Sequence, residues 1–241
     1  MRVWDISPGY LTRQSLLGEH REIHALTSVM ENNKRGFAHH PETLRWKRHL
    51  GGLKMRHALV VSEMAVRGYR HCSPVMEEEL RSWPDTFVDP PGAQFGILLE
   101  KSRQRQAGRI PLPRTVRQLW LQHKYSVLAR EPALHDELGR LLTQRGRLPT
   151  FEALAAQMVV LLRQRPPEPL MLNALQSMWS HECRRSSAPT QIGADPETLL
   201  ERIRKLAVQR DTVLLLESTA LSDLASWLGV SAVGQSGGLQ S

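Results

Sequence analysis

The sequence has little cysteine, no long apolar run and no leader pattern at its start. Its 241 residues include only Cys72 and Cys183, which lack the CxxC spacing of zinc sites and disulfide frameworks. We therefore expect a reducing, cytoplasmic location, at the bacterial nucleoid when the protein acts. No window approaches 18 uninterrupted apolar residues, and no basic stretch precedes an apolar one at the start. A soluble, unprocessed chain without a membrane partner is expected.

Strand patterns are also missing. No segment alternates apolar and polar residues for long enough to predict a strand, and no repeat recurs at a fixed period. Hydrophobic residues make up 41% of the chain, which is ordinary for a globular protein, and they recur mainly at helical spacing. The expected fold class is all-α.

The first half of the chain contains three helical patterns. An amphipathic helix is predicted over residues 12–31. A second, longer pattern begins at Pro41, and Gly51 and Gly52 are expected to bend or divide it. After a turn-rich stretch, a third helix is predicted to follow Pro90.

A domain boundary is predicted at IPLP, residues 110–113, because two prolines there precede a new helical pattern. Four helical patterns follow this boundary. A further helix is predicted to be capped by Asp195 with Pro196 at its first position. The expected parts of the chain are a first domain at 1–112, a helical accessory domain at 113–230 and a disordered tail at 231–241.

Basic residues outnumber acidic ones by 32 to 24, which gives a formal net charge of +8 and a pI near 10.1. Such a balance favours a polyanionic partner such as nucleic acid. Residues 1–112 hold 17 Lys and Arg against 12 Asp and Glu, together with seven of the ten His. Nucleic-acid chemistry is therefore expected in the first region.

The start of the chain combines a terminal amine with Glu22 on the first predicted helix. An α-amino group has a reference pKa of about 7.7 to 8.0, so a useful fraction is an uncharged nucleophile near neutral pH. Its attack on C1′ of a deoxyribose forms an imine, and a nearby carboxylate can handle the protons of the ensuing β-elimination. Arg21 beside Glu22 can hold a phosphate. The same residues also fit a solvent-exposed ion pair, and the pattern leaves both interpretations open.

Several motifs of the first region match one known family. In MRVWDISPGYLTRQSLLGEHREIH, residues 1–24, the gapless matches are Arg2, Leu11, Gln14, Leu16, Glu19, Arg21 and Glu22. The likeness continues through NNKRG at 32–36, LGGLKMRHALVVSEMAVRGYRH at 50–71 and SWPDTFVDPPGAQFGILLEKSRQRQAGR at 82–109. On these motifs, residues 1–112 resemble the phage pyrimidine-dimer DNA glycosylases, the T-even phage endonuclease V family.

The resemblance implies a compact, endonuclease V-like helical domain with DNA glycosylase and abasic-site lyase activity. The catalytic glutamate of the family corresponds to Glu22, and Arg2, Gln14 and Arg21 correspond to DNA-contacting positions. The nucleophilic amine corresponds to that of Met1, which we expect to be retained because Arg2 is too bulky for ordinary removal of the methionine. The implied partner is double-stranded DNA carrying a damaged base or an abasic site, with no cofactor.

The sequence departs from the family pattern at positions that bear on the substrate. The terminal threonine of the family is replaced by Met1, its helix histidine by Ser15, and a basic residue after the glutamate by Ala25. The aromatic, lysine-bearing tail associated with dimer recognition is replaced by a further helical region. The resemblance therefore predicts base excision without fixing which lesion is removed.

The second region resembles an uncharacterised bacterial helical domain over residues 114–142, through its HKY and LGRLL patterns. This likeness implies a second domain but no activity. Three tryptophans of this region fall on apolar faces and are predicted to pack in the core: Trp120, Trp179 and Trp227.

Further basic residues of the first region are predicted to contact DNA: Lys34, Arg35, Arg45, Lys47, Arg48 and Arg56. Trp46, which lies among them, fits either a DNA-facing or a core position. At the end of the third predicted helix, phosphate binding and complementation of the helix dipole are alternatives for Arg103, Arg105 and Arg109.

A metal site is not expected. His20 and His24 are four residues apart on one helix face, but a closed site needs two more ligands. The alternative to an enzyme is a noncatalytic nucleic-acid-binding or interaction module on the same helical scaffold, which would bind DNA in a salt-sensitive manner without forming an imine.

Overall fold

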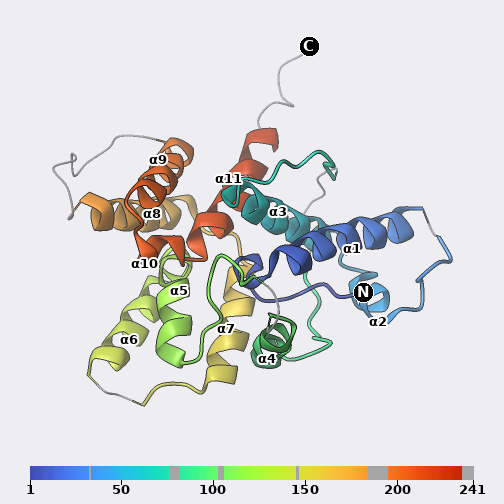
Figure 1. Cartoon of the computed structure of the whole chain (residues 1–241), viewed down its shortest axis with the longest axis horizontal. Helices are drawn as coiled ribbons and strands as arrows, with labels where there is room; N and C mark the ends of the chain where they lie inside the picture. The colour runs from blue at the N-terminus through green and yellow to red at the C-terminus, as the bar shows by residue number, and fades with distance from the viewer. Residues whose placement is uncertain (33, 76–81, 103–105, 145–146, 184–194, 235–241) are drawn as a thin grey trace, which may run out of the picture.

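The computed structural model describes residues 1–32, 34–75, 82–102, 106–144, 147–183 and 195–234. These ranges fold into helices without a strand, so the predicted all-α class is confirmed (Figure 1). Within them, none of the helices combines the length and apolar character needed to cross a membrane.

Where the first region is described, it contains four α-helices and one short 3₁₀-helix: η1 at Pro8–Tyr10, α1 at Arg13–Glu31, α2 at Pro41–Trp46, α3 at Leu50–Val66 and α4 at Pro91–Ser102. The predicted first helix is confirmed, and it begins where Thr12 Oγ1 accepts a hydrogen bond from the Ser15 N–H at 3.1 Å. This cap satisfies one of the backbone donors that a helix start leaves without a partner.

The long pattern after Pro41 is divided at residues 47–49, before the two glycines predicted to divide it. Gly51 and Gly52 instead lie in the first turn of α3. A Cβ atom added at Gly52 would lie 2.6 Å from the backbone oxygen of Ser82. The missing side chain therefore permits a close approach between α3 and the loop before α4.

The described residues of the second region form seven helices: α5 at Val116–Leu128, α6 at Pro132–Thr143, α7 at Phe151–Leu162, α8 at Glu168–Cys183, α9 at Pro196–Gln209, α10 at Val213–Leu216 and α11 at Ala220–Gly234. The predicted cap is confirmed, because Asp195 accepts from the Thr198 N–H at 3.0 Å and Pro196 opens α9. Residues 231–234, predicted as tail, are helical. A helix tolerates glycine at a cost of only about 1 kcal/mol, so Gly229 does not end it. Residues 235–241 lie outside the described ranges.

The largest hydrophobic core runs across the predicted boundary at residues 110–113. It contains Trp4 and Leu16 from the first region together with Leu119 and Met158 from the second. Figure 1 shows α7 between α5 and α4, both of which it contacts. The division into two domains stays a prediction, but apolar burial joins the two regions in this structure.

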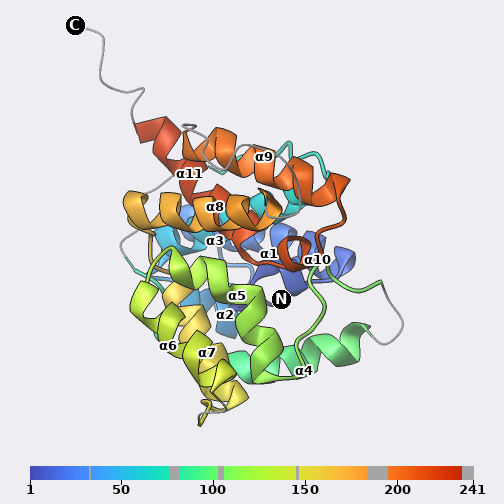
Figure 2. The same cartoon turned by 90° about the vertical axis from the view of Figure 1, so that its left-hand side faces the viewer.

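The C-terminal helix also packs on the first region. Met55 and Leu59 of α3 form a small core cluster with Trp227 of α11. The Ser62 hydroxyl donates to the backbone oxygen of Ser222 at 2.7 Å. Figure 2 shows α11 and α9 at the end of the molecule opposite α4. Helix α3 thus contacts both α1 and α11.

Candidate active site at the N-terminus

The N-terminal segment is held by hydrogen bonds from four consecutive backbone N–H groups to side-chain oxygens of neighbouring helices. The donor and acceptor pairs are Arg2 to Glu22, Val3 to Glu42 at 3.3 Å, Trp4 to Glu19 at 2.9 Å and Asp5 to Gln94 at 2.9 Å. The partners alternate between α1 and another helix, as expected where successive groups point to opposite sides of the backbone. This arrangement fixes the direction of the chain up to its first residue.

The terminal amine lies beside Glu22. The Met1 nitrogen is 3.9 Å from Glu22 Oε1, and the Glu22 side chain is 35% exposed. The other carboxylate oxygen accepts a hydrogen bond from the Arg2 N–H. A carboxylate in this position can exchange protons with the amine and still meet a ligand from solvent. The structure therefore brings together the two groups on which the predicted imine chemistry depends.

Glu19 supports this arrangement from inside the protein. Its carboxylate accepts from Arg56 at 2.8 and 3.0 Å, and Arg56 also donates to the Ile6 backbone oxygen at 2.9 Å. Burial raises the pKa of Glu19, and the Arg56 guanidinium opposes this shift. The pair connects α1, α3 and the N-terminal segment, so the position of Met1 depends on buried groups that do not reach the surface.

The first third of the chain is similar to a known family. Residues 1–77 match the pyrimidine dimer DNA glycosylase family. Residues 1–77, named the glycosylase region below after the family that they match, contain Met1, Glu22 and their buried support, and they end before the residue 112 reached by the sequence resemblance. No curated protein and no solved structure matches the chain. These comparisons therefore do not support the likeness noted for residues 114–142.

Two predicted DNA contacts in the glycosylase region are corrected by the structure. The side chains of Arg45 and Arg56 are 4% and 3% exposed. Arg45 pairs with Asp5 and with Glu42, and it donates to the Thr86 backbone oxygen at 2.9 Å. A guanidinium this deeply buried needs carboxylate partners, and these fill its donor positions. Both arginines therefore stabilise the fold and present no donors to a phosphate.

The other basic and polar candidates of the glycosylase region lie at the surface: Gln14, Arg21, Lys34, Arg35, Lys47 and Arg48. Arg21 donates to the Leu17 backbone oxygen at 3.1 Å, and Lys34 donates to the Ser28 hydroxyl at 2.8 Å. Arg2 is half-buried, pairs with Asp89 at 2.5 Å and lies over the Trp4 ring. The DNA-contacting role of these residues stays a prediction.

The remaining candidates that the structure describes pack against other parts of the protein. Trp46 is fully buried, and the three tryptophans of the second region are buried as predicted. Arg109 pairs with Glu63 at 2.7 Å and donates to backbone oxygens of Leu216 and Ser218. It therefore connects α3 to the second region, whereas Arg103 and Arg105 lie outside the described residues.

Asp5 is a supporting residue that the sequence analysis missed. Its carboxylate accepts from Arg45, from Arg163 of the second region at 2.5 Å and from Gln94 at 2.9 Å. The one signal in the sequence is an acidic residue between Trp4 and Ile6, both of which are core residues. Such a residue needs buried cationic partners, but the sequence does not tell which ones.

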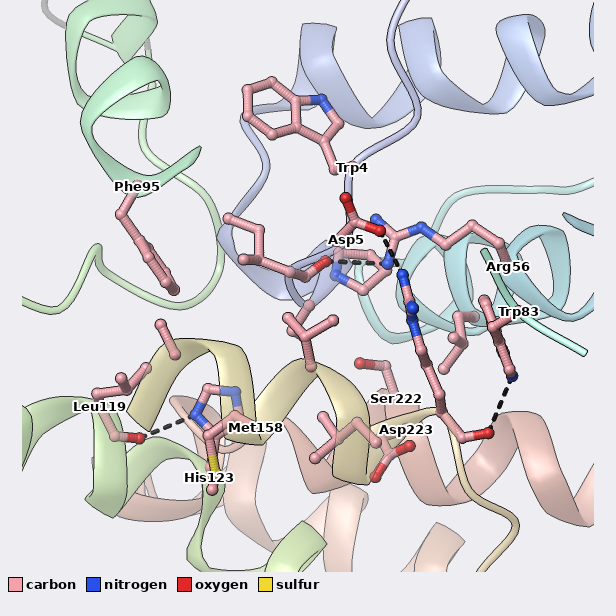
Figure 3. Close-up of a pocket in the computed structure, with 18 of the residues that line it drawn as sticks. Trp4, Asp5, Arg56, Trp83, Phe95, Leu119, His123, Met158, Ser222 and Asp223 are labelled. Carbon is pink, nitrogen blue, oxygen red and sulfur yellow. Dashed lines mark hydrogen bonds and ion pairs between the residues drawn. The ribbon is translucent and has the colours of Figure 1, made fainter. Parts of the chain in front are cut away.

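An internal cavity of about 30 Å³ lies behind the N-terminal segment, lined in part by Asp5, Arg56, His123 and Asp223 (Figure 3). This volume admits about one or two water molecules and no nucleotide. Figure 3 shows side chains from both regions around it. The cavity is a packing feature between the regions and is separate from the pair of Met1 and Glu22.

A second cluster of functional groups lies beside α1 and includes side chains from other segments. His20 and His24 are joined by His57 and His71, and one nitrogen of each of the four rings lies within 4.8 Å of the others. Two histidines beyond the pair on α1 therefore come from α3 and from the stretch after it. No sequence spacing connects these positions, so the sequence indicates only the pair on α1.

Proposed function

We propose that the glycosylase region removes a damaged base from duplex DNA and then cleaves the strand as an abasic-site lyase. The observation that supports this function is the Met1 amine 3.9 Å from Glu22, within a region that matches a DNA glycosylase family. A pyrimidine dimer is the first substrate to test, because the matching family is named for it.

The chemistry needs only the amine and a carboxylate. The uncharged amine attacks C1′ of the damaged nucleotide, and the bond from C1′ to the base breaks. The departing base takes the electron pair and a proton, while the new nitrogen substituent loses a proton to Glu22. Opening of the sugar ring then transfers a proton to O4′ and gives an imine between C1′ and the Met1 nitrogen.

Strand cleavage follows from this imine. Removal of a C2′ proton by Glu22 expels the phosphate oxygen from C3′ and leaves a double bond between C2′ and C3′. Water hydrolyses the imine and restores the free amine. The surface residues Gln14, Arg21, Lys34 and Arg35 are proposed to contact the phosphates, and extrusion of a damaged nucleotide costs only a few kcal/mol.

Borohydride trapping tests the proposal directly, because it reduces the imine to a stable covalent bond between protein and DNA. Native protein is incubated with duplexes that contain an abasic site or a pyrimidine dimer. A second sample carries a short extension before Met1, and a third carries Glu22→Gln. The glutamine retains an oxygen that accepts from the Arg2 N–H, so this variant tests proton transfer with the segment still held.

The native protein is expected to form an adduct, and the extended protein is not, because its α-amine lies away from Glu22. Glu31→Gln, on the same helix, is the matched control and should trap like the native protein. An adduct with the extended protein would move the nucleophile to a lysine such as Lys34 or Lys54. Salt-sensitive DNA binding without any adduct would replace the enzyme by a noncatalytic binding module.

A further inference from the structure

The four clustered histidines come from three segments of the glycosylase region. His20 and His24 occupy successive turns of α1, and His57 lies on α3. His71 follows the turn that ends α3, where Gly68 adopts a φ of 73° that favours glycine. This turn leads the chain back toward α1, and the ring of His71 lies 5.1 Å from that of His20 and 5.3 Å from that of His57.

Three of the rings direct the same nitrogen toward a common point. The Nε2 atoms of His20 and His24 are 3.3 Å apart, and each lies 3.2 Å from Nε2 of His57. Hydrogen bonds among the rings do not satisfy this triangle. If one of the three nitrogens carries a proton, it can donate to the other two. The lone pairs of those two nitrogens then still face each other.

The spacing is close to that of ligands around a tetrahedral metal ion. With a Zn–N distance of about 2.0 to 2.1 Å, two nitrogens of a tetrahedral zinc site lie about 3.3 to 3.4 Å apart. The fourth ring is placed to complete the set, because Nε2 of His71 is buried and has no hydrogen-bond partner. A small rotation of this ring, which belongs to a segment outside the helices, brings its nitrogen toward the other three.

The surroundings of His20, His24 and His57 also lower the pKa values of these three rings. Burial, followed by the charge of neighbouring imidazoles, lowers the pKa of His57 to about 3 and that of His20 to about 4. Burial and His71 lower the pKa of His24 in the same way. Neutral imidazole is the form that binds transition metals, so an ion meets ligands with free lone pairs near neutral pH.

We propose that His20, His24, His57 and His71 bind one divalent transition-metal ion with the tetrahedral preference of zinc. The site is structural, since Glu22 is two residues from each of the α1 ligands and therefore lies about 160° away around the helix. A bound ion would join α1, α3 and the segment after α3. This proposal stands independently of base excision.

Metal binding to the full-length protein tests the site. The protein is stripped with a chelator, and zinc is titrated in competition with a chromophoric chelator. Cobalt(II) is then added as a spectroscopic probe, because tetrahedral cobalt gives visible absorption bands that octahedral cobalt lacks. One equivalent of tight zinc, a tetrahedral cobalt spectrum and a higher melting temperature with zinc are expected.

The variants His20→Ala and His71→Ala should lower zinc affinity by at least about tenfold and remove the cobalt bands. His71 lies outside the helices, so its replacement removes one proposed ligand with little risk to folding. Replacement of the core residue His57 would endanger folding. The matched controls Cys72→Ser and His39→Gln, both at exposed positions, should bind like the native protein. Absence of tight binding to native protein, or unchanged binding by both alanine variants, would overturn the proposal.

Discussion

Glu19 and Arg56 form a buried pair joined by two hydrogen bonds, and through it α1, α3 and the N-terminal segment are fixed to one another. Glu19 also accepts from the Trp4 N–H. The partly exposed carboxylate of Glu22 thus lies one helical turn from a carboxylate with a structural role. Glu19 and Glu22 lie three residues apart on the same helix, but they differ in burial. The buried Glu19 holds the fold, and Glu22 is the carboxylate beside the Met1 amine.

Removing Arg56 should therefore destabilise the protein strongly. Arg56→Ala leaves the buried Glu19 carboxylate without its cation, and breaking such a pair costs about 3 to 5 kcal/mol. Urea unfolding measures the change in the free energy of unfolding. Arg48→Ala, at an exposed position near the end of α2, is the control and should stay within about 0.5 kcal/mol of the native protein. Equal effects of the two substitutions would contradict the structural role of Arg56.

The exposed and buried arginines should also differ in DNA binding, if the proposed function holds. Arg35→Ala should weaken binding to all duplex sequences and lower the magnitude of the salt slope by about 1, as loss of one phosphate contact does. Fluorescence anisotropy at several salt concentrations measures both quantities. Arg45→Ala should chiefly lower the free energy of unfolding, because Arg45 is paired with Asp5 and Glu42. A normal salt slope in Arg35→Ala would remove Arg35 from the DNA-contacting surface.

Glu63 should make stability depend on acidic pH. Burial raises its pKa, but Arg109 and Arg67 outweigh that effect, and the pKa in the folded protein lies below its ordinary value. The stabilisation is therefore fully present above the unfolded pKa of about 4.3 and is lost as the pH falls through the lower folded value. The urea concentration at the midpoint of unfolding should therefore decrease as the pH is lowered through this range in the native protein. Glu63→Gln should show a shallower decline, and identical pH profiles would refute the assignment.

Replacement by alanine should have opposite effects on stability at two glycines. At Gly52, a Cβ atom would lie 2.6 Å from the Ser82 backbone oxygen, so Gly52→Ala should destabilise by about 1 to 3 kcal/mol. At Gly18, inside α1, no atom beyond the adjoining residues and the backbone of the helix itself lies within 4 Å of the added Cβ. Gly18→Ala should therefore stabilise by up to about 1 kcal/mol, since alanine is the better helix former. Thermal melts compare the two, and destabilisation of both would contradict the open space at Gly18.

Local signals allowed much of the helical structure to be predicted. Helix periodicity located α1 and α5 to α9, and the predicted cap at Asp195 is confirmed because a helix start needs an acceptor within a few residues. The placement of Glu22 near the Met1 amine came from matching residues 1–24 to a family rather than from periodicity. The helices and the cap depend on residues close in the sequence, and the placement of Glu22 depends on a continuous match over residues 1–24.

The sequence by itself determined the helices, the basic balance and the residues that match the glycosylase family. Only the tertiary structure decided that Arg45 and Arg56 are buried while Arg48 is exposed, and that His57 and His71 join His20 and His24. A helical pattern repeats every 3.6 residues and identifies an apolar face, but it does not tell which distant helix covers that face. Contacts between distant segments depend on how the helices pack, and this packing assembled both the support of Met1 and the histidine cluster.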